Sequence, residues 1–180
     1  MSANPNCDPR LSGEAVRWHT WPMIRRESIA EHSWQVARVL LAIWPMCPRE
    51  LLVHAIVHDL GETGPGDAPY PSKLNSPLLA SEHRRLERET HESMVLPWSL
   101  PAPQELDHVW HNVFKLAEFM EMWEKSLQEM FMGNRLAQLP LERCSEGMRK
   151  HTSILLDLEE TEVCQRAMRY VERRRLEWTI

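Results

Sequence analysis

Helical periodicity is the feature that most constrains the fold of this 180-residue chain. Apolar side chains recur every three or four residues in nearly every regular segment, as they do along the buried face of an amphipathic helix. We find no segment with the strict alternation that is typical of a half-buried strand. The sequence therefore predicts an all-α fold, a single helical bundle that spans residues 1–180.

Capping and breaking residues place the predicted helices. Ser28 and Glu31 form a capping box, which predicts a helix start at about Ile29. Residues 61–77 contain three glycines and four prolines, so this stretch is predicted to be a loop. The helix predicted over residues 104–132 can break near Asn112. The predicted helices span about 28–44, 49–60, 76–95 and 104–132, followed after Pro140 by a short helix and by a long one over 150–175.

Composition excludes several classes of protein. The net charge of -5 provides no overall positive field for nucleic acid, so any phosphate binding is expected to be local. No apolar run reaches the length of a membrane span, and the first seven residues lack the apolar core of a signal peptide. The four cysteines are scattered without a CxxC spacing, which favours reduced thiols. We expect a cytoplasmic protein with no membrane or nucleic-acid partner.

A histidine followed by a His-Asp pair indicates a metal site. His58 and Asp59 are adjacent, and His32 lies 26 residues upstream, where its spacing from Val36 turns it toward the buried side of a helix. Two imidazoles, a carboxylate and a distant acid can close around one divalent ion, and these donors suit Zn, Mn, Co or Fe. Because a metal with an open position activates water, the pattern favours hydrolysis.

The fourth metal ligand is expected from a distant helix. Glu118 lies in a mostly apolar stretch, where an unpaired carboxylate would be costly, and a metal would explain its burial. Glu121, one helical turn further on, is the alternative. Four other histidines sit in charged or polar surroundings and are predicted to lie at the surface: His83, His91, His108 and His111.

These residues resemble the H…HD…D signature of the HD-domain phosphohydrolases, an all-helical superfamily. A longer set is similar to the YfbR-type 5′-deoxynucleotidases and their phage relatives, among them dATP triphosphohydrolases: Arg17-Trp18, residues 28–33, residues 58–62, Gly66-Asp67 and Lys73. The resemblance covers roughly residues 14–134, and the superfamily has Asp where this chain has Glu118. It implies one HD domain over 1–180, which the helices over 141–175 complete, and a homo-oligomer. It also implies one divalent ion (Zn, Co or Mn), with Mg on a triphosphate substrate.

The resemblance also implies roles around the metal. Glu62 is expected to be the general acid or base, and Asp67 a second catalytic residue that contacts the nucleotide at its sugar 3′-hydroxyl or departing O5′. Arg17 and Lys73 are expected to bind phosphate, since forked guanidinium donors and a lysine charge suit phosphoryl oxygens. Trp18 is expected to stack on the base or wall it off.

The substrate is predicted to be a small deoxynucleotide whose α-phosphorus is attacked by metal-bound water. Cations close to the site in sequence mildly favour a triphosphate: Arg25, Arg26, Lys73, Arg84, Arg85 and Arg88. Our leading prediction is a phage-type dATP triphosphohydrolase, acting in the host cytoplasm and releasing deoxyadenosine and triphosphate. The alternative is a 5′-deoxynucleotidase that acts on monophosphates. A noncatalytic HD-like nucleotide sensor is a third reading, against which the presence of Glu62 and Asp67 argues.

Overall fold

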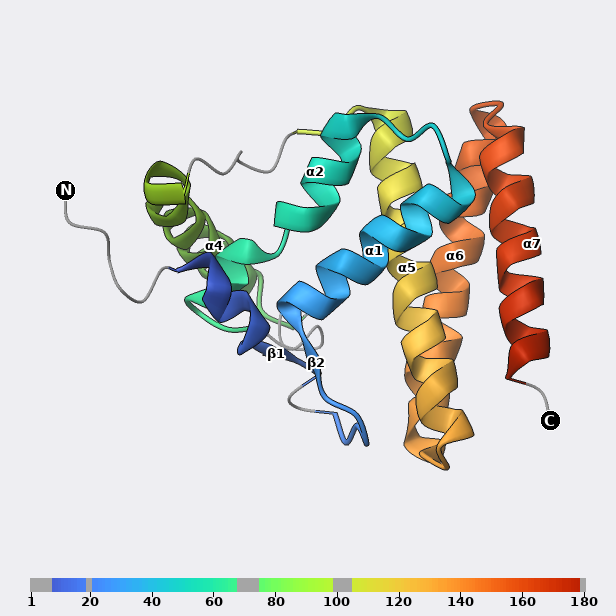
Figure 1. Ribbon diagram of the computed structural model, residues 1–180, viewed down its shortest axis with the longest axis horizontal. Helices are drawn as coiled ribbons and strands as arrows, with labels where there is room; N and C mark the ends of the chain where they lie inside the picture. The colour runs from blue at the N-terminus through green and yellow to red at the C-terminus, as the bar shows by residue number, and fades with distance from the viewer. Residues whose placement is uncertain (1–7, 19–20, 68–74, 99–104, 179–180) are drawn as a thin grey trace. The chain divides into compact units, whose positions relative to one another are not determined.

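Helices dominate the computed structural model, which describes residues 8–18, 21–67, 75–98 and 105–178. The prediction of an all-α protein is confirmed (Figure 1). The α-helices of the described residues are α1 (Ile29–Ile43), α2 (Arg49–Val57), α4 (Pro77–Trp98), α5 (His108–Phe131), α6 (Gln138–Asp157) and α7 (Thr161–Glu177). Short 3-10 helices form at η1 (Pro9–Gly13), η2 (Leu60–Thr63) and η3 (Arg135–Ala137). Within the described ranges, no helix combines the length and apolar composition that crossing a membrane requires.

Among the described residues, a short antiparallel ladder departs from the all-helical expectation. Strand β1 (Val16–Arg17) pairs with β2 (Glu27–Ser28), and Val16 lies opposite Ser28 while Arg17 lies opposite Glu27. Strands of two residues are too short to show any alternation in the sequence. Helix α1 follows β2 directly, and the Glu31 backbone N–H donates to the Ser28 hydroxyl (3.1 Å), which confirms the predicted N-terminal cap.

Several helix ends differ from the prediction. Helix α2 ends at Val57 rather than near residue 60. Helix α5 runs unbroken through Asn112, whose side-chain amide donates back to the His108 carbonyl oxygen (2.7 Å). Helix α6 starts before Pro140 and continues to Asp157, so the boundary predicted near residue 150 lies instead at Glu159, whose φ is +63°.

The chain falls into two compact units. The first comprises Met1–Pro22, Arg26–Trp34 and Ile56–Gln104, and the second comprises Met23–Arg25, Gln35–Ala55 and Glu105–Ile180. Each unit is described by itself below. The single-domain organisation over residues 1–180 stays a prediction.

The second unit contains the main apolar core. Helices α5, α6 and α7 lie side by side in Figure 1, and each packs against the other two. The approach of α5 and α6 is close at Gly147, where an added Cβ would lie 2.6 Å from the Phe119 ring. Fully or nearly fully buried side chains of this core include Val36, Leu40, Ile43, Leu51, Val113, Leu116, Met120, Leu155 and Cys164.

Glu129 ties the chain segment before β2 to the end of α5. Its carboxylate is fully buried and accepts hydrogen bonds from the backbone N–H groups of Ile24 (2.7 Å) and Arg25 (2.9 Å). The Asn134 amide donates to the same carboxylate (2.9 Å), and the Lys125 ammonium lies 3.7 Å away. Lys125 also donates to the Arg25 carbonyl oxygen (2.7 Å). The backbone at Ile24 and Arg25 is thus held by the buried acid Glu129 and the buried base Lys125.

In the first unit, η2 rests directly on α4. A Cβ added to Gly61 would lie 2.3 Å from the backbone carbonyl oxygen of Glu87, and one added to Gly64 would lie 2.3 Å from the Thr90 hydroxyl. The two glycines therefore allow an approach that no larger residue permits. This contact places the residues between and after them, Glu62 to Asp67, against α4.

Candidate metal and substrate site

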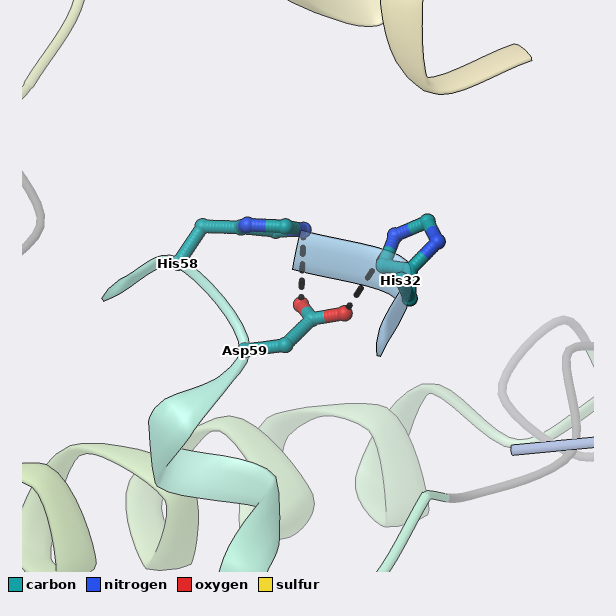
Figure 2. A group of neighbouring side chains, drawn as sticks. All are labelled: His32, His58 and Asp59. Carbon is teal, nitrogen blue, oxygen red and sulfur yellow. Dashed lines mark ion pairs between the residues drawn. The ribbon is translucent and has the colours of Figure 1, made fainter. Parts of the chain in front are cut away.

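His32, His58 and Asp59 come together within the first unit. The first turn of α1 carries His32, and the turn after α2 carries His58 and Asp59. Figure 2 shows one oxygen of the Asp59 carboxylate facing each imidazole. The Nε2 atom of His32 lies 3.8 Å from Asp59 Oδ2, and Nε2 of His58 lies 3.3 Å from Asp59 Oδ1. Ligand atoms of all three residues lie within 4.8 Å of one another, so the sequence prediction of their proximity holds.

Charge and burial set the ionisation of these groups. Burial would raise the pKa of the Asp59 carboxyl. The His58 ring that faces it and the ion-paired Arg17 guanidinium instead hold this pKa well below its usual value. Burial, reinforced by the charge of Arg17, lowers the pKa of His32 to about 3. At neutral pH the cluster therefore presents a carboxylate beside a neutral imidazole, which are the forms that bind metals.

This donor set fits a divalent ion. Imidazole nitrogen and carboxylate oxygen are ligands of Zn²⁺ and of the neighbouring first-row metals. Catalytic sites of this kind combine about three protein ligands with an open position for water or substrate. The cluster of His32, His58 and Asp59 has the composition and the size that such a site requires.

The predicted fourth ligand lies on α5, in the second unit. The Glu118 carboxylate forms an ion pair with the Lys115 ammonium (2.5 Å), whereas Glu121 is more deeply buried, with 3% of its surface exposed. Both acids face the same side of α5, since they are three residues apart. The assignment of Glu118, with Glu121 as the alternative, stays a prediction.

Glu62 and Asp67 share an electrostatic environment with the cluster. Glu62 is buried in η2, one turn after His58 and Asp59. Burial would lower the pKa of the Arg17 guanidinium, but the nearby carboxylates of Asp59, Glu62 and Asp67 raise it instead. The two predicted catalytic acids therefore lie close enough to Arg17 to stabilise its charge.

Trp18 adopts a backbone conformation that is rare for a large side chain. Its φ is +59°, in the left-handed region that L-residues other than Gly, Asn and Asp seldom visit. Its indole N–H donates to the Glu27 carboxylate (2.9 Å), which anchors the ring. Strained backbone of this kind concentrates at functional sites. The placement of Trp18 beside the substrate stays a prediction.

The predicted phosphate-binding cations have different surroundings. Arg84 lies on the exposed face of α4 and lines, with Ser81, Glu87 and Arg88, a depression of about 460 Å³. Arg85 forms ion pairs with Glu82 and Glu89 on its own helix, which makes its guanidinium less available to bind phosphate. Arg25 and Arg26 are exposed, Arg25 belonging to the second unit and Arg26 to the first, and Lys73 lies outside the described residues.

Two histidines predicted to lie at the surface are buried. The exposed fraction is 7% for His83 and 5% for His91. The prediction was wrong because α4 turns these positions inward although charged residues surround them in the sequence. His83 donates through Nε2–H to the Gly66 carbonyl oxygen (2.9 Å), a contact that sequence reasoning missed.

Comparison with known proteins connects this geometry to a family. Residues 14–132 match the family model of the HD domain. The 5′-deoxynucleotidase of Photorhabdus laumondii is 27% identical over 159 residues, covering 78% of this chain and 81% of that protein. The corresponding enzyme of Vibrio parahaemolyticus is 30% identical over 135 residues, with coverage of 63% and 70%.

A solved structure shares the fold. The HD phosphohydrolase DatZ of cyanophage S-2L, bound to dA and one catalytic Zn²⁺ ion, superposes with a TM-score of 0.63. The two sequences are 24% identical, and the match covers 92% of each chain. At this identity the likeness establishes the fold alone.

Proposed function

This chain belongs to the HD-domain family of metal-dependent hydrolases, and we propose that it cleaves the phosphate ester of a deoxynucleotide. The observation that carries the proposal is the meeting of His32, His58 and Asp59 ligand atoms within 4.8 Å, with Arg17 ion-paired to Asp59. The curated relatives named 5′-deoxynucleotidases support a deoxynucleotide as the substrate class. Since they are named as enzymes, a noncatalytic sensor is the weaker reading.

We place one divalent ion on His32, His58 and Asp59, with an acid of α5 as the further ligand. Bound there, the ion would act as a Lewis acid that activates water and neutralises phosphate charge. Zinc is the first candidate, because the DatZ structure contains one catalytic Zn²⁺. The neutral imidazole of His32 and the ionised carboxylate of Asp59 are ready to bind without first losing a proton.

Arg17 is suited to hold the phosphate. A guanidinium carries five N–H donors, and the ion pair with Asp59 uses only part of them. The Nε–H of Arg17 is buried and has no hydrogen-bond partner among the described residues. It is therefore available to a phosphoryl oxygen, while the same side chain keeps its ion pair with Asp59.

Glu62 is suited to transfer the proton. It is buried one turn beyond Asp59 and lies near the positive charge of Arg17. A general acid or base must stand within hydrogen-bond reach of the reacting group, and these neighbours support the proposed role of Glu62. Asp67, in the same electrostatic environment, is proposed to contact the nucleotide beyond the phosphate.

The finer proposal is that the substrate is dATP, cleaved to deoxyadenosine and triphosphate. DatZ holds dA, and this chain and DatZ match over 92% of both lengths. Arg84 and Arg88, on the exposed face of α4, offer cations for the additional phosphates. The names of the curated relatives favour a second candidate, a 5′-deoxynucleotidase that releases inorganic phosphate from monophosphates.

Product analysis distinguishes the two candidates. Protein loaded with Zn²⁺, Co²⁺ or Mn²⁺ is incubated with dATP and with dAMP, and the phosphorus products are identified by ³¹P NMR. Triphosphate from dATP is the expected result, and phosphate from dAMP alone would establish the monophosphatase instead. Arg84→Ala should weaken dATP hydrolysis and spare dAMP hydrolysis, whereas Arg17→Ala should weaken both. No hydrolysis of any deoxynucleotide with any of the three metals would overturn the proposed function.

A further inference from the structure

His83 links α4 to the peptide that precedes Asp67. Its ring is buried, and its Nε2–H donates to the Gly66 carbonyl oxygen (2.9 Å). The other ring nitrogen, Nδ1, lies 2.5 Å from the Glu87 carboxylate, one turn further along α4. The hydrogen bond at Nε2 directs this nitrogen at Gly66.

Gly66 is held at both of its backbone polar groups. Its N–H donates to the Glu62 carbonyl oxygen (2.7 Å), and its carbonyl oxygen accepts from His83. Its φ is +81°, a conformation in which the backbone can reverse toward Asp67. The peptide between the two predicted catalytic acids is therefore tied to Glu62 on one side and to α4 on the other.

This arrangement restrains the backbone that precedes Asp67. The carbonyl carbon of Gly66 is bonded to the backbone nitrogen of Asp67, so a rotation of that peptide would swing the Asp67 carboxylate. A displacement of about 1 Å in a reacting group can lower a rate by about a hundredfold. The hydrogen bond from His83 opposes such a rotation, and the close contact of Gly61 with the Glu87 backbone holds the start of the same segment.

We propose that His83 is a positioning residue for deoxynucleotide hydrolysis, which orients Asp67 through Gly66. The inference rests on the proposed function, since it assigns His83 a part in that reaction. His83 itself touches no reacting atom in this proposal. Its effect is exerted entirely through the backbone that precedes Asp67.

Three single variants test the proposal. His83→Leu removes the donor, and His83→Gln restores one, because the glutamine amide can donate to the Gly66 carbonyl oxygen. His91→Leu is the matched control, since His91 is equally buried and lies two turns further along the same helix. We expect His83→Leu to lower kcat/KM by about 10- to 100-fold, the range found for residues that orient a catalytic group. His83→Gln should recover most of that loss, and His91→Leu should leave kcat/KM within about twofold of wild type.

Two further readouts separate positioning from general damage. Metal content and Tm are measured for every variant, and the metal content of His83→Leu should equal that of wild type. In an Asp67→Ala background, His83→Leu should cause no additional loss, because the group that His83 orients is already gone. Full activity of His83→Leu in an active wild-type background would overturn the inference and leave the proposed function intact. Equal losses in His83→Leu and His91→Leu, or additive losses with Asp67→Ala, would also overturn it. An inactive wild type would remove the proposed function and this inference with it.

Discussion

Replacing Glu129 with alanine should be among the most destabilising changes in the second unit. Burial alone would raise the pKa of this carboxyl, but hydrogen bonds from the Asn134 amide and from the backbone of Arg25 and Ile24 lower it. The lowered pKa means that the folded protein stabilises the carboxylate form. The Ala variant removes the acceptor of three hydrogen bonds and the charge that faces Lys125.

The magnitude follows from those contacts. A hydrogen bond to a charged acceptor contributes about 1.5–3 kcal/mol, but three bonds to one carboxylate do not add independently. Removing one partner of a buried ion pair costs about 3–5 kcal/mol, and we expect Glu129→Ala to fall in this range. Lys125 keeps its hydrogen bond to the Arg25 carbonyl oxygen, which limits the loss. Since a domain of this kind is stable by about 5–15 kcal/mol, the variant should lose a large part of its stability.

Urea denaturation measures the effect. The free energy of unfolding is obtained from the midpoint and slope for wild type, Glu129→Ala, Glu129→Gln and a control, Glu82→Ala. Glu82 is an exposed acid paired with Arg85, and its removal should cost little, because solvent screens such a surface pair. Glu129→Gln keeps an acceptor oxygen and should be intermediate. A loss in Glu129→Ala no larger than that in Glu82→Ala would refute this reasoning.

Further outcomes are expected from single changes. Asp59→Ala should lose most bound metal in elemental analysis, whereas Glu62→Gln should retain it and lose about a hundredfold in turnover, because glutamine transfers no proton. Normal metal content in Asp59→Ala would contradict the ligand set. Gly61→Ala should lower Tm by several degrees through its clash with the α4 backbone, whereas Gly13→Ala, with nothing within 4 Å of the new Cβ, should change it little. Because the pKa of Glu129 is lowered in the folded protein, its carboxylate contributes to stability fully above the unfolded pKa of about 4.5. This contribution is lost as the pH falls through the folded pKa. Acid denaturation of Glu129→Ala should therefore lack the loss of stability that wild type shows in this pH range.

Local signals made the helical fold and part of the site predictable. The Ser28 cap acts over a few residues, so the sequence was sufficient to place the start of α1. It placed the end of α2 near residue 60, whereas the helix ends at Val57. The meeting of His32 with the His58-Asp59 pair was predicted from their metal-ligating side chains, and the resemblance to the superfamily signature added to that prediction. The end of α6 was predicted poorly, because Glu159 adopts a positive φ without the glycine that usually marks such a residue.

The remaining features depend on contacts between distant segments. Charged neighbours made His83 look exposed, and only the packing of η2 on α4 shows that it is buried. Likewise, Arg85 is one of several similar arginines in the sequence, yet its ion pairs with Glu82 and Glu89 set it apart. The choice between Glu118 and Glu121 as a metal ligand, and the predicted homo-oligomer, stay predictions for the same reason.

The bare backbone contact between η2 and α4 has a mechanical consequence. Side chains ordinarily separate two packed helices, and changes of rotamer accommodate small shifts of one helix along the other. At Gly61 no such side chain exists, and a translation of α4 would be transmitted at full amplitude to the segment that carries Glu62. Because the outer face of α4 presents Arg84 and Arg88, a displacement of that face would reach the segment that carries Glu62, the predicted general acid or base.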